Sequence, residues 1–340
     1  MDYQTLQTLW FVLIAVLFTG FFLLEGYDYG VGVLLPFVSK NDAERRMVIN
    51  AIGPFWDGNE VWLLTAGGAI FAAFPNWYAT LFSGFYLALF LILIALIVRG
   101  VAFEFRSKDE NPRWRSLWDA ALFIGSFLPA LLWGVAVGNF LRGVAIDASM
   151  TVVGSFFDLL NPYALLGGVL TLTLFTLHGA LFLELKTDGL VRERVQKITR
   201  WLWLPVTVIA LAFVGYSALE TDMFAALNIV EILGLVGAVA GLLFTGAMIF
   251  TKRFGRAFLG TGITLVGTVA LVFATLFPRV LPSTLGAEFD LTIYNASSSE
   301  YTLGVMTVIA LTLVPVILAY QAWTYWVFRK RLTAQSHLEY

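Results

Sequence analysis

The sequence predicts an all-α integral membrane protein with nine transmembrane helices. Its 340 residues are 59% hydrophobic and only 13% charged, which leaves too little polar surface to dissolve a globule of this size. Nine apolar stretches are each long enough to cross a hydrocarbon core of about 30 Å at roughly 1.5 Å per residue. Basic residues collect in alternate gaps between these stretches. Composition, stretch length and charge pattern therefore agree on the fold class.

The apolar stretches define the expected elements in order along the chain. They span residues 7–37, 47–75, 77–105, 114–141, 161–185, 198–219, 224–251, 257–278 and 301–328. Because backbone polar groups in lipid must be satisfied within a segment, all nine are expected to be helices despite many Val, Ile and Phe residues. The connections are short except for outer loops at about 142–160 and 279–300 and a basic loop near 186–200. Residues 1–340 should form one membrane domain, with two four-helix bundles plus one additional helix as the natural arrangement.

The distribution of Lys and Arg predicts the orientation of the chain. Of the 21 basic residues, 18 follow the first, third, fifth, seventh and ninth stretches, whereas Arg142 and Arg279 occupy the other gaps and Arg99 lies inside a stretch. Loops rich in Lys and Arg face the cytoplasm. The N-terminus is therefore expected outside and the C-terminus in the cytoplasm. The first stretch should stay in the mature protein, because Asp2 stands where a signal peptide carries a basic residue.

Several residue types are scarce or absent, and this restricts the chemistry. With no cysteine, the chain can form neither disulfides nor thiolate metal sites. Its two histidines are His178, in the fifth stretch, and His337, in the tail, so two intramembrane histidines cannot hold a haem within this chain. His178 is more typical of a hydrogen-bonded helix contact than of an iron ligand. There is no Walker motif, and a net charge of −2 gives no indication of a nucleic-acid partner. The chain is expected to ligate no metal or cofactor itself.

Five charged side chains inside the first three stretches, about 7–105, are the main functional candidates. Glu25 and Asp28 lie three apart in the first stretch, Asp57 and Glu60 lie three apart in the second, and Arg99 lies in the third. Residues three apart share a helix face, so each pair is predicted to point into the bundle. Counting residues inward from the basic end of each stretch places the charged side chains of all three stretches in the cytoplasmic half of the membrane. A carboxylate in a bilayer is costly and needs a partner, a proton or a path to water.

Two interpretations of this cluster are open. In one, the charges neutralise one another and hold three helices in register. Against it, one guanidinium cannot discharge four carboxyl groups, so some must be protonated or hydrated, as a proton path from the cytoplasm requires. In the second interpretation Arg99 biases the charge states and Trp56 shields the path. The proton path then consists of Asp57, Asp28, Glu25, Glu60, Arg99 and Trp56.

Three further patterns predict local structure. Gly26 and Gly30 lie four apart, which indicates close helix packing. Pro54 is expected to loosen the second helix just before the charged pair, because proline removes a backbone donor. An interfacial aromatic belt is predicted just before the final basic cluster, at Trp323, Tyr325 and Trp326.

Short segments around these charges carry a more specific signal. They are GYDYGVG (26–32), NDAERR (41–46), FWDGNEVWL (55–63), FSGFY (82–86), FRSK (105–108), WR (114–115), FIGSF (123–127) and QAW (321–323). Together they resemble subunit II of the bacterial cytochrome bd-type quinol oxidases, densely over the first 145 residues and less so afterwards. The chain departs from that family at Glu60, where Gln often stands, and in a very short loop at 220–223.

The resemblance implies a nine-helix subunit that pairs with a haem-bearing subunit I in the bacterial cytoplasmic membrane. Such a complex oxidises quinol, reduces dioxygen to water with protons taken from the cytoplasm, and carries two b-type haems and one d-type haem in subunit I. Proton-path proposals in the family involve the acid at Asp57, and an oxygen route is associated with the tryptophan at Trp62. Membrane lipids, quinone and a small single-helix accessory subunit are further candidate partners. A proton-coupled secondary transporter is the alternative, since midplane acids and broken helices also occur there.

Overall fold

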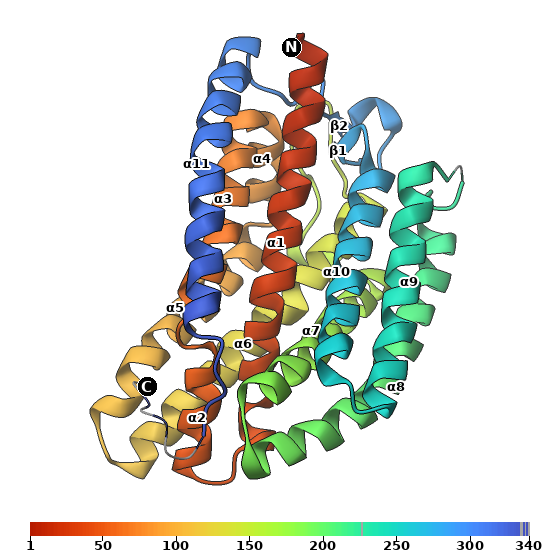
Figure 1. Cartoon of the computed structure of the whole chain (residues 1–340). Helices are drawn as coiled ribbons and strands as arrows, with labels where there is room; N and C mark the ends of the chain where they lie inside the picture. Colours follow the sequence, from red (N-terminus) through yellow and green to blue (C-terminus); the bar gives the residue numbers. More distant parts are fainter. Residues whose placement is uncertain (226, 334–335, 337, 339–340) are drawn as a thin grey trace.

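The computed structural model describes residues 1–225, 227–333, 336 and 338, and in this part of the chain the architecture is helical (Figure 1). His337 lies outside the described residues. The elements in chain order are α1 (Tyr3–Val38), α2 (Asp42–Ile52), α3 (Trp56–Ala73), α4 (Pro75–Gly84), α5 (Tyr86–Phe105), η1 (Arg106–Lys108), α6 (Pro112–Arg142), η2 (Phe156–Leu160), α7 (Pro162–Lys186), α8 (Gly189–Glu220), α9 (Ile229–Phe250), α10 (Phe254–Leu276), β1 (Arg279–Leu281), η3 (Ala287–Phe289), β2 (Leu291–Thr292) and α11 (Glu300–Val327).

Eight of the described helices are long and apolar enough to cross a membrane, namely α1 and α5 to α11. They correspond to eight of the nine apolar stretches. The remaining stretch, 47–75, is divided between α2 and α3 at Gly53, Pro54 and Phe55, which confirms the loosening expected at the proline. The third stretch, 77–105, is divided as well, between α4 and α5 at Phe85.

The prediction of a basic loop at 186–200 is wrong. Helix α8 begins at Gly189, shortly after α7 ends. The first turns of α8 extend beyond the apolar stretch and carry its basic residues on a helix. There Arg194 Nη1 lies 2.6 Å from Glu44 Oε2 on α2. Burial alone would raise the pKa of Glu44, but hydrogen bonds from Arg194 and from the backbone N–H of Lys40 hold that pKa below its ordinary value.

Helix α1 forms the centre of the molecule and packs against α3, α6, α7 and α10. Figure 1 shows it between α11 and α10, running from the end that holds the two strands to the end that holds α2. Asp2 caps its first turn by accepting a hydrogen bond of 2.8 Å from the Thr5 N–H. Every residue from 25 to 35 is buried. This segment of α1 is therefore surrounded by other helices rather than by lipid. It fixes the positions of the polar groups that it carries.

Small residues allow the helices to approach closely. A Cβ built on Gly30 would lie 1.9 Å from the carbonyl oxygen of Phe175 on α7, and one on Gly179 would lie 2.6 Å from the Gly30 carbonyl carbon. This contact confirms the close packing expected from the glycine spacing. Helices α9 and α10 meet in the same way, with Gly234 of α9 against the backbone of Gly267.

Two outer loops fold over one end of the bundle. Strands β1 and β2 pair antiparallel, and Val144 in the other loop bridges to Ser283 beside them. The Nε2 of Gln7 near the start of α1 donates to Ser297 Oγ at 2.7 Å. Figure 1 places the strands at the same end as the start of α1. The two long loops therefore form one cap that also holds the first turns of α1.

A network of ion pairs organises the opposite, basic end. Arg106 lies 2.6 Å from Asp119 on α6 and 2.9 Å from Asp42 on α2, while Arg45 and Arg115 each contact one of these two carboxylates. Single exposed pairs contribute little stability, whereas linked pairs with buried members fix geometry. The network links α2 to η1, directly after α5, and to α6.

Helices α7, α8, α9 and α10 each contact the next, and α10 returns to α7. Helix α6 packs on α1 and α5, and α3 packs on α1, while α11 rests mainly on α1 and α3. The grouping into two four-helix bundles plus one helix, and the direction of the termini, stay predictions.

The contact between α1 and α7 leads to a first prediction. Gly30→Ala should lower the melting temperature of the purified protein, because its methyl group would overlap the Phe175 carbonyl and overpacking typically costs about 1–3 kcal/mol. Gly215→Ala on α8 is the matched control, since a Cβ there meets nothing within 4 Å. Equal melting temperatures for the two variants would contradict the close contact.

Candidate functional site

The candidate site is a buried cluster of charged groups from α1, α3 and α5. Helix α1 contributes Glu25 and Asp28, and both side chains are fully buried. Their spacing of three residues turns both carboxyl groups toward the same side of α1. Because the residues around them on α1 are also buried, neither group can turn toward lipid.

Arg99 on α5 is the centre of the cluster. Its Nη1 lies 2.5 Å from Glu25 Oε1 and 2.7 Å from Glu60 Oε1. The guanidinium is fully buried and lies 5.0 Å from the ring centroid of Tyr29, a distance at which an aromatic face attracts a cation. Gly125 of α6 permits this placement, because a Cβ there would lie 2.6 Å from the Arg99 Cβ. One cation therefore joins α1, α3 and α5.

Asn59 links the cluster to α11. Its Nδ2 donates to Asp28 Oδ2 at 2.6 Å and to the Tyr27 hydroxyl at 2.8 Å. Its Oδ1 accepts from the Tyr325 hydroxyl at 3.0 Å and from Gln321 Nε2 at 3.3 Å. A single buried amide thus uses its donors and its acceptor to connect three helices.

The break before α3 sets the position of these groups. Gly53 and Pro54 end the helical run of α2, and α3 restarts at Trp56. Glu60 and Asn59 therefore lie in the first turns of α3, close to its N-terminus. Unpaired N–H groups at a helix start carry partial positive charge, which favours carboxylates nearby.

The charges of the buried cluster do not balance. Three carboxyl groups, from Glu25, Asp28 and Glu60, face the single guanidinium of Arg99. Other polar atoms are buried without a hydrogen-bond partner in the described chain, namely Glu25 Oε2, Asp28 Oδ1, Tyr29 Oη, Arg99 Nε and Arg99 Nη2. Unpaired buried polar groups are rare and costly in proteins. In the described chain this buried cluster therefore has more carboxyl groups than cations.

The expectation that both acids of the second stretch point into the bundle is wrong for Asp57. Asp57 is exposed on α3, whereas the side chain of Glu60 is 18% exposed and contacts Arg99. Positions three apart on a helix differ by about 60° in direction, and here Asn59 occupies the buried face. Asp57 still lies within one helical turn of Glu60 on α3. The structure therefore brings together Glu25, Asp28, Glu60 and Arg99 and leaves Asp57 at their margin.

The two candidate tryptophans lie on either side of α3. The Trp56 ring stacks on Phe103 with centroids 4.7 Å apart, and Phe103 in turn lies beside Arg99. Trp62 donates its Nε1–H to Gln321 Oε1 at 3.0 Å. Its ring packs against α1 at Gly20, where a Cβ would lie 2.1 Å away. Trp56 thus covers the cluster through Phe103, and Trp62 contacts the Gln321 that bonds to Asn59.

His178 is engaged through both ring nitrogens. Its Nδ1 lies 2.6 Å from Thr261 Oγ1 and its Nε2 lies 3.1 Å from the Leu23 carbonyl oxygen. The ring also stacks on Phe258 with centroids 4.4 Å apart. This is the hydrogen-bonded helix contact that the sequence favoured. Among the described residues, no group of three or more His, Cys, Asp or Glu side chains could hold a metal ion.

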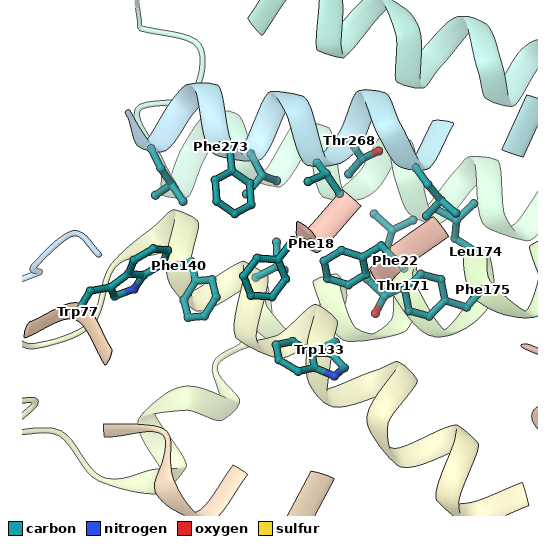
Figure 2. A pocket seen from close by; sticks show the side chains of 16 residues that line it. Phe18, Phe22, Trp77, Trp133, Phe140, Thr171, Leu174, Phe175, Thr268 and Phe273 are labelled. Carbon is teal, nitrogen blue, oxygen red and sulfur yellow. The ribbon is translucent and has the colours of Figure 1, made fainter. Parts of the chain in front are cut away.

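A small apolar cavity of about 70 Å³ lies between α1, α6, α7 and α10. Figure 2 shows aromatic rings converging on it, among them Phe18 and Phe22 of α1, Trp133 and Phe140 of α6, and Phe273 of α10. The lining side chains are hydrocarbon apart from two threonine hydroxyl groups and the indole N–H groups of Trp77 and Trp133, so the space suits a small apolar molecule. Trp62 is not among its lining residues.

Sequence reasoning missed Tyr325 and Asn59. Tyr325 was interpreted as part of an aromatic belt, but its hydroxyl bonds to Tyr27 and Asn59 inside the bundle. Trp323 and Trp326 are 58% and 61% exposed, as a belt requires. The signal that could have identified Asn59 is an amide one residue before a buried acid.

The fold and the cluster define a class, a multi-pass membrane protein with an ionisable interior site. The family model of cytochrome bd terminal oxidase subunit II matches residues 6–328. The chain belongs to this family, which confirms the resemblance seen in its motifs. It is a multi-pass bacterial membrane protein and a subunit of an oxidoreductase complex.

Relatives over nearly the whole chain agree with this assignment. Cytochrome bd ubiquinol oxidase subunit 2 of Bacillus subtilis (strain 168) is 46% identical over 336 residues, which cover 99% of each chain. Cytochrome bd-I ubiquinol oxidase subunit 2 of Escherichia coli (strain K12) is 40% identical over 369 residues, covering 98% of this chain and 97% of the relative. A chain of the bd oxidase structure from Geobacillus thermodenitrificans has a TM-score of 0.76 at 16% identity, covering 95% of this chain and 98% of that chain. At that identity the likeness shows the fold alone.

The central ion pairs lead to a second prediction. Arg99→Met should lower the melting temperature strongly, because it leaves buried carboxylates uncompensated, at a typical cost of about 3–5 kcal/mol. Adding Glu25→Gln to this variant should restore part of the loss. Arg142→Met is the control, since its single pair with Glu220 is partly exposed and worth at most about 1 kcal/mol. Equal effects of the two arginine substitutions would contradict the central role of Arg99.

Proposed function

We propose that this chain is the subunit II of a bd-type quinol:O2 oxidoreductase and that its buried cluster relays protons from the cytoplasm. Family membership supports the first part and disfavours the secondary transporter that the sequence left open. Subunit I would hold the redox centres, two b-type haems and one d-type haem, and the complex would oxidise quinol and reduce dioxygen to water. This chain would contribute the ionisable path and ligate no haem.

The observation that supports the proposed relay most directly is the excess of carboxyl groups over cations around Arg99. Two like charges about 4 Å apart repel by about 4 kcal/mol at an effective dielectric constant of about 20. Three carboxylates beside one guanidinium would therefore be strongly unfavourable, and taking up a proton relieves that repulsion. A group of acids that shares protons in this way can accept one from one side and release it to another.

The depth of the carboxyl groups, from the margin of the cluster to its buried centre, suggests the order of the relay. Asp57 is exposed, Glu60 is partly exposed, and Glu25 and Asp28 are fully buried. Protons would pass from Asp57 to Glu60, cross beside Arg99 to Glu25, and reach Asp28. Arg99 would bias the charges along this path and Trp56 would shield it through Phe103.

The exposure of Asp57 also supports the presence of a partner subunit. Asp57 lies on the outer face of α3 near Val61 and Leu64, which are 46% and 72% exposed. A carboxylate on a face that lies in lipid is costly, so this face would be covered by subunit I. A small single-helix accessory subunit would be a further component of the complex. The apolar cavity of Figure 2 offers a space for dioxygen, with Trp62 as the proposed contact on its route.

The proposed topology has nine crossings, with α2 and α3 together as the second. Both α1 and α11 begin at the end that holds the strands (Figure 1). The basic residues at the other end indicate the cytoplasm. The N-terminus would then lie outside and the C-terminus inside, in the cell membrane.

The relay leads to a third prediction, tested on the purified complex. Glu60→Gln and Asp57→Asn should each slow oxygen consumption with quinol about a hundredfold or more, the usual scale for losing a proton-transfer group. Reduction of the haems by quinol, followed by stopped-flow absorption, should stay fast. Proton uptake measured with a pH-sensitive dye should slow in parallel with oxygen consumption.

Glu231→Gln is the matched control for these variants. Glu231 is also a buried acid, but it caps the start of α9 far from the cluster. Its variant should consume oxygen at the unsubstituted rate. Normal turnover of the Glu60 and Asp57 variants with full haem content would contradict the relay, and loss of haem would indicate a role in assembly instead.

A further inference from the structure

A large groove runs along the membrane-embedded face between α1, α7, α9 and α10. Its volume is about 920 Å³, and the last residues of α11 lie at one end of it. The walls are almost entirely carbon and include Leu233 and Leu259, which are 63% and 61% exposed. On α10 the groove extends from Gly255 to Ala270, which corresponds to about 22 Å at roughly 1.5 Å per residue. Half of a hydrocarbon core is about 15 Å, so the groove can take a long apolar chain.

Two cationic side chains lie at the basic end of this groove, Lys186 and Arg329. Lys186 Nζ donates to the Phe328 carbonyl and lies over the Phe55 ring at 5.1 Å, and Arg329 Nη1 donates to the Trp326 carbonyl. In the described part of the chain neither side chain pairs with a carboxylate. No carboxylate of the described residues therefore compensates their positive charges.

Five other basic residues at this end do pair with carboxylates. Arg45, Arg106, Arg115, Arg192 and Arg194 each lie within 2.9 Å of a carboxylate oxygen. No Asp or Glu lines the groove among the described residues, and its far end, near Val230 and Ala270, is uncharged. An occupant would therefore have an anionic group at the basic end and an apolar body along the rest.

We propose that the groove binds an anionic phospholipid, with its phosphate between Lys186 and Arg329 and its acyl chains along α10. Basic pockets between transmembrane helices on the cytoplasmic side recognise acidic lipid headgroups. The neutral headgroup of a quinone would leave both cations unpaired, so charge complementarity favours the phospholipid. This inference does not depend on the proton relay.

The absence of cysteine from the chain permits a direct test. Ile263→Cys places one thiol in the groove, and Leu211→Cys on α8, 64% exposed, is the control outside it. Each variant of the purified complex is labelled with a thiol-reactive fluorophore, with the unsubstituted complex as the background for partner cysteines. The complexes are placed in phosphatidylcholine vesicles that contain brominated phosphatidylglycerol or brominated phosphatidylcholine at equal mole fraction.

Brominated phosphatidylglycerol should quench the Ile263 label more strongly than brominated phosphatidylcholine, and the Leu211 label should be quenched equally by both. Arg329→Gln should lower the preference at Ile263 about fivefold, the effect expected from one interfacial cation. Arg200→Gln, which removes an exposed basic residue of α8 outside the groove, should leave the preference unchanged.

Three outcomes would overturn the proposal. Equal quenching of the Ile263 label by both lipids would show that the headgroup is not recognised. Failure of the fluorophore to react at Ile263 in the folded complex would show that a partner subunit covers the groove. Quenching by neither lipid, together with quinone released on solvent extraction, would assign the groove to quinone.

Discussion

The structure depends on one buried cation, the guanidinium of Arg99, placed between Glu25 and Glu60. Desolvating an arginine and its partners costs several kcal/mol per ion, so such a group adds little net stability to a membrane bundle. The contribution of this group of charges is to fix how the three helices are aligned along their axes. Glu25, Glu60 and Arg99 belong to three different helices, and a shift of any one by a single turn would leave a charge unpaired. The close contacts at Gly30 and Gly125 make this arrangement sterically accessible.

The hydrogen bonds of Asn59 extend the same constraint to the last helix. Helix α11 packs lightly on the rest of the molecule, yet its Tyr325 and Gln321 bond to the amide that also holds Asp28. Asp28 and α11 are therefore held by the same side chain. The ionisable site is a property of the packed bundle rather than of the segment that contains its motif.

The sequence predicted much of this fold because membrane insertion follows simple rules of length and charge. The apolar stretches located the eight helices long enough to span a membrane. The three-residue spacings pointed to Glu25, Asp28 and Glu60, and Arg99 was identified as the single basic residue inside a stretch. The errors share a physical cause. Composition indicates neither where a helix ends nor the direction in which a side chain points from its helix. Basic residues at the start of α8 indicated a loop, although a helix can continue past the membrane. Asp57 and Tyr325 were assigned to the wrong faces because rotation about a helix axis is fixed only by tertiary contacts.

The separation of Glu25 from Arg99 along the chain has a consequence for biogenesis. These two residues pair across 74 positions, so α1 leaves the ribosome well before the cation that compensates it. Until α5 has been made, the two acidic groups of α1 have no cation to pair with, and lipid disfavours them in that state. Their compensation therefore waits for α5, and the hydrogen bonds of Asn59 to Gln321 and Tyr325 wait for α11. The order of translation thus becomes an order of assembly.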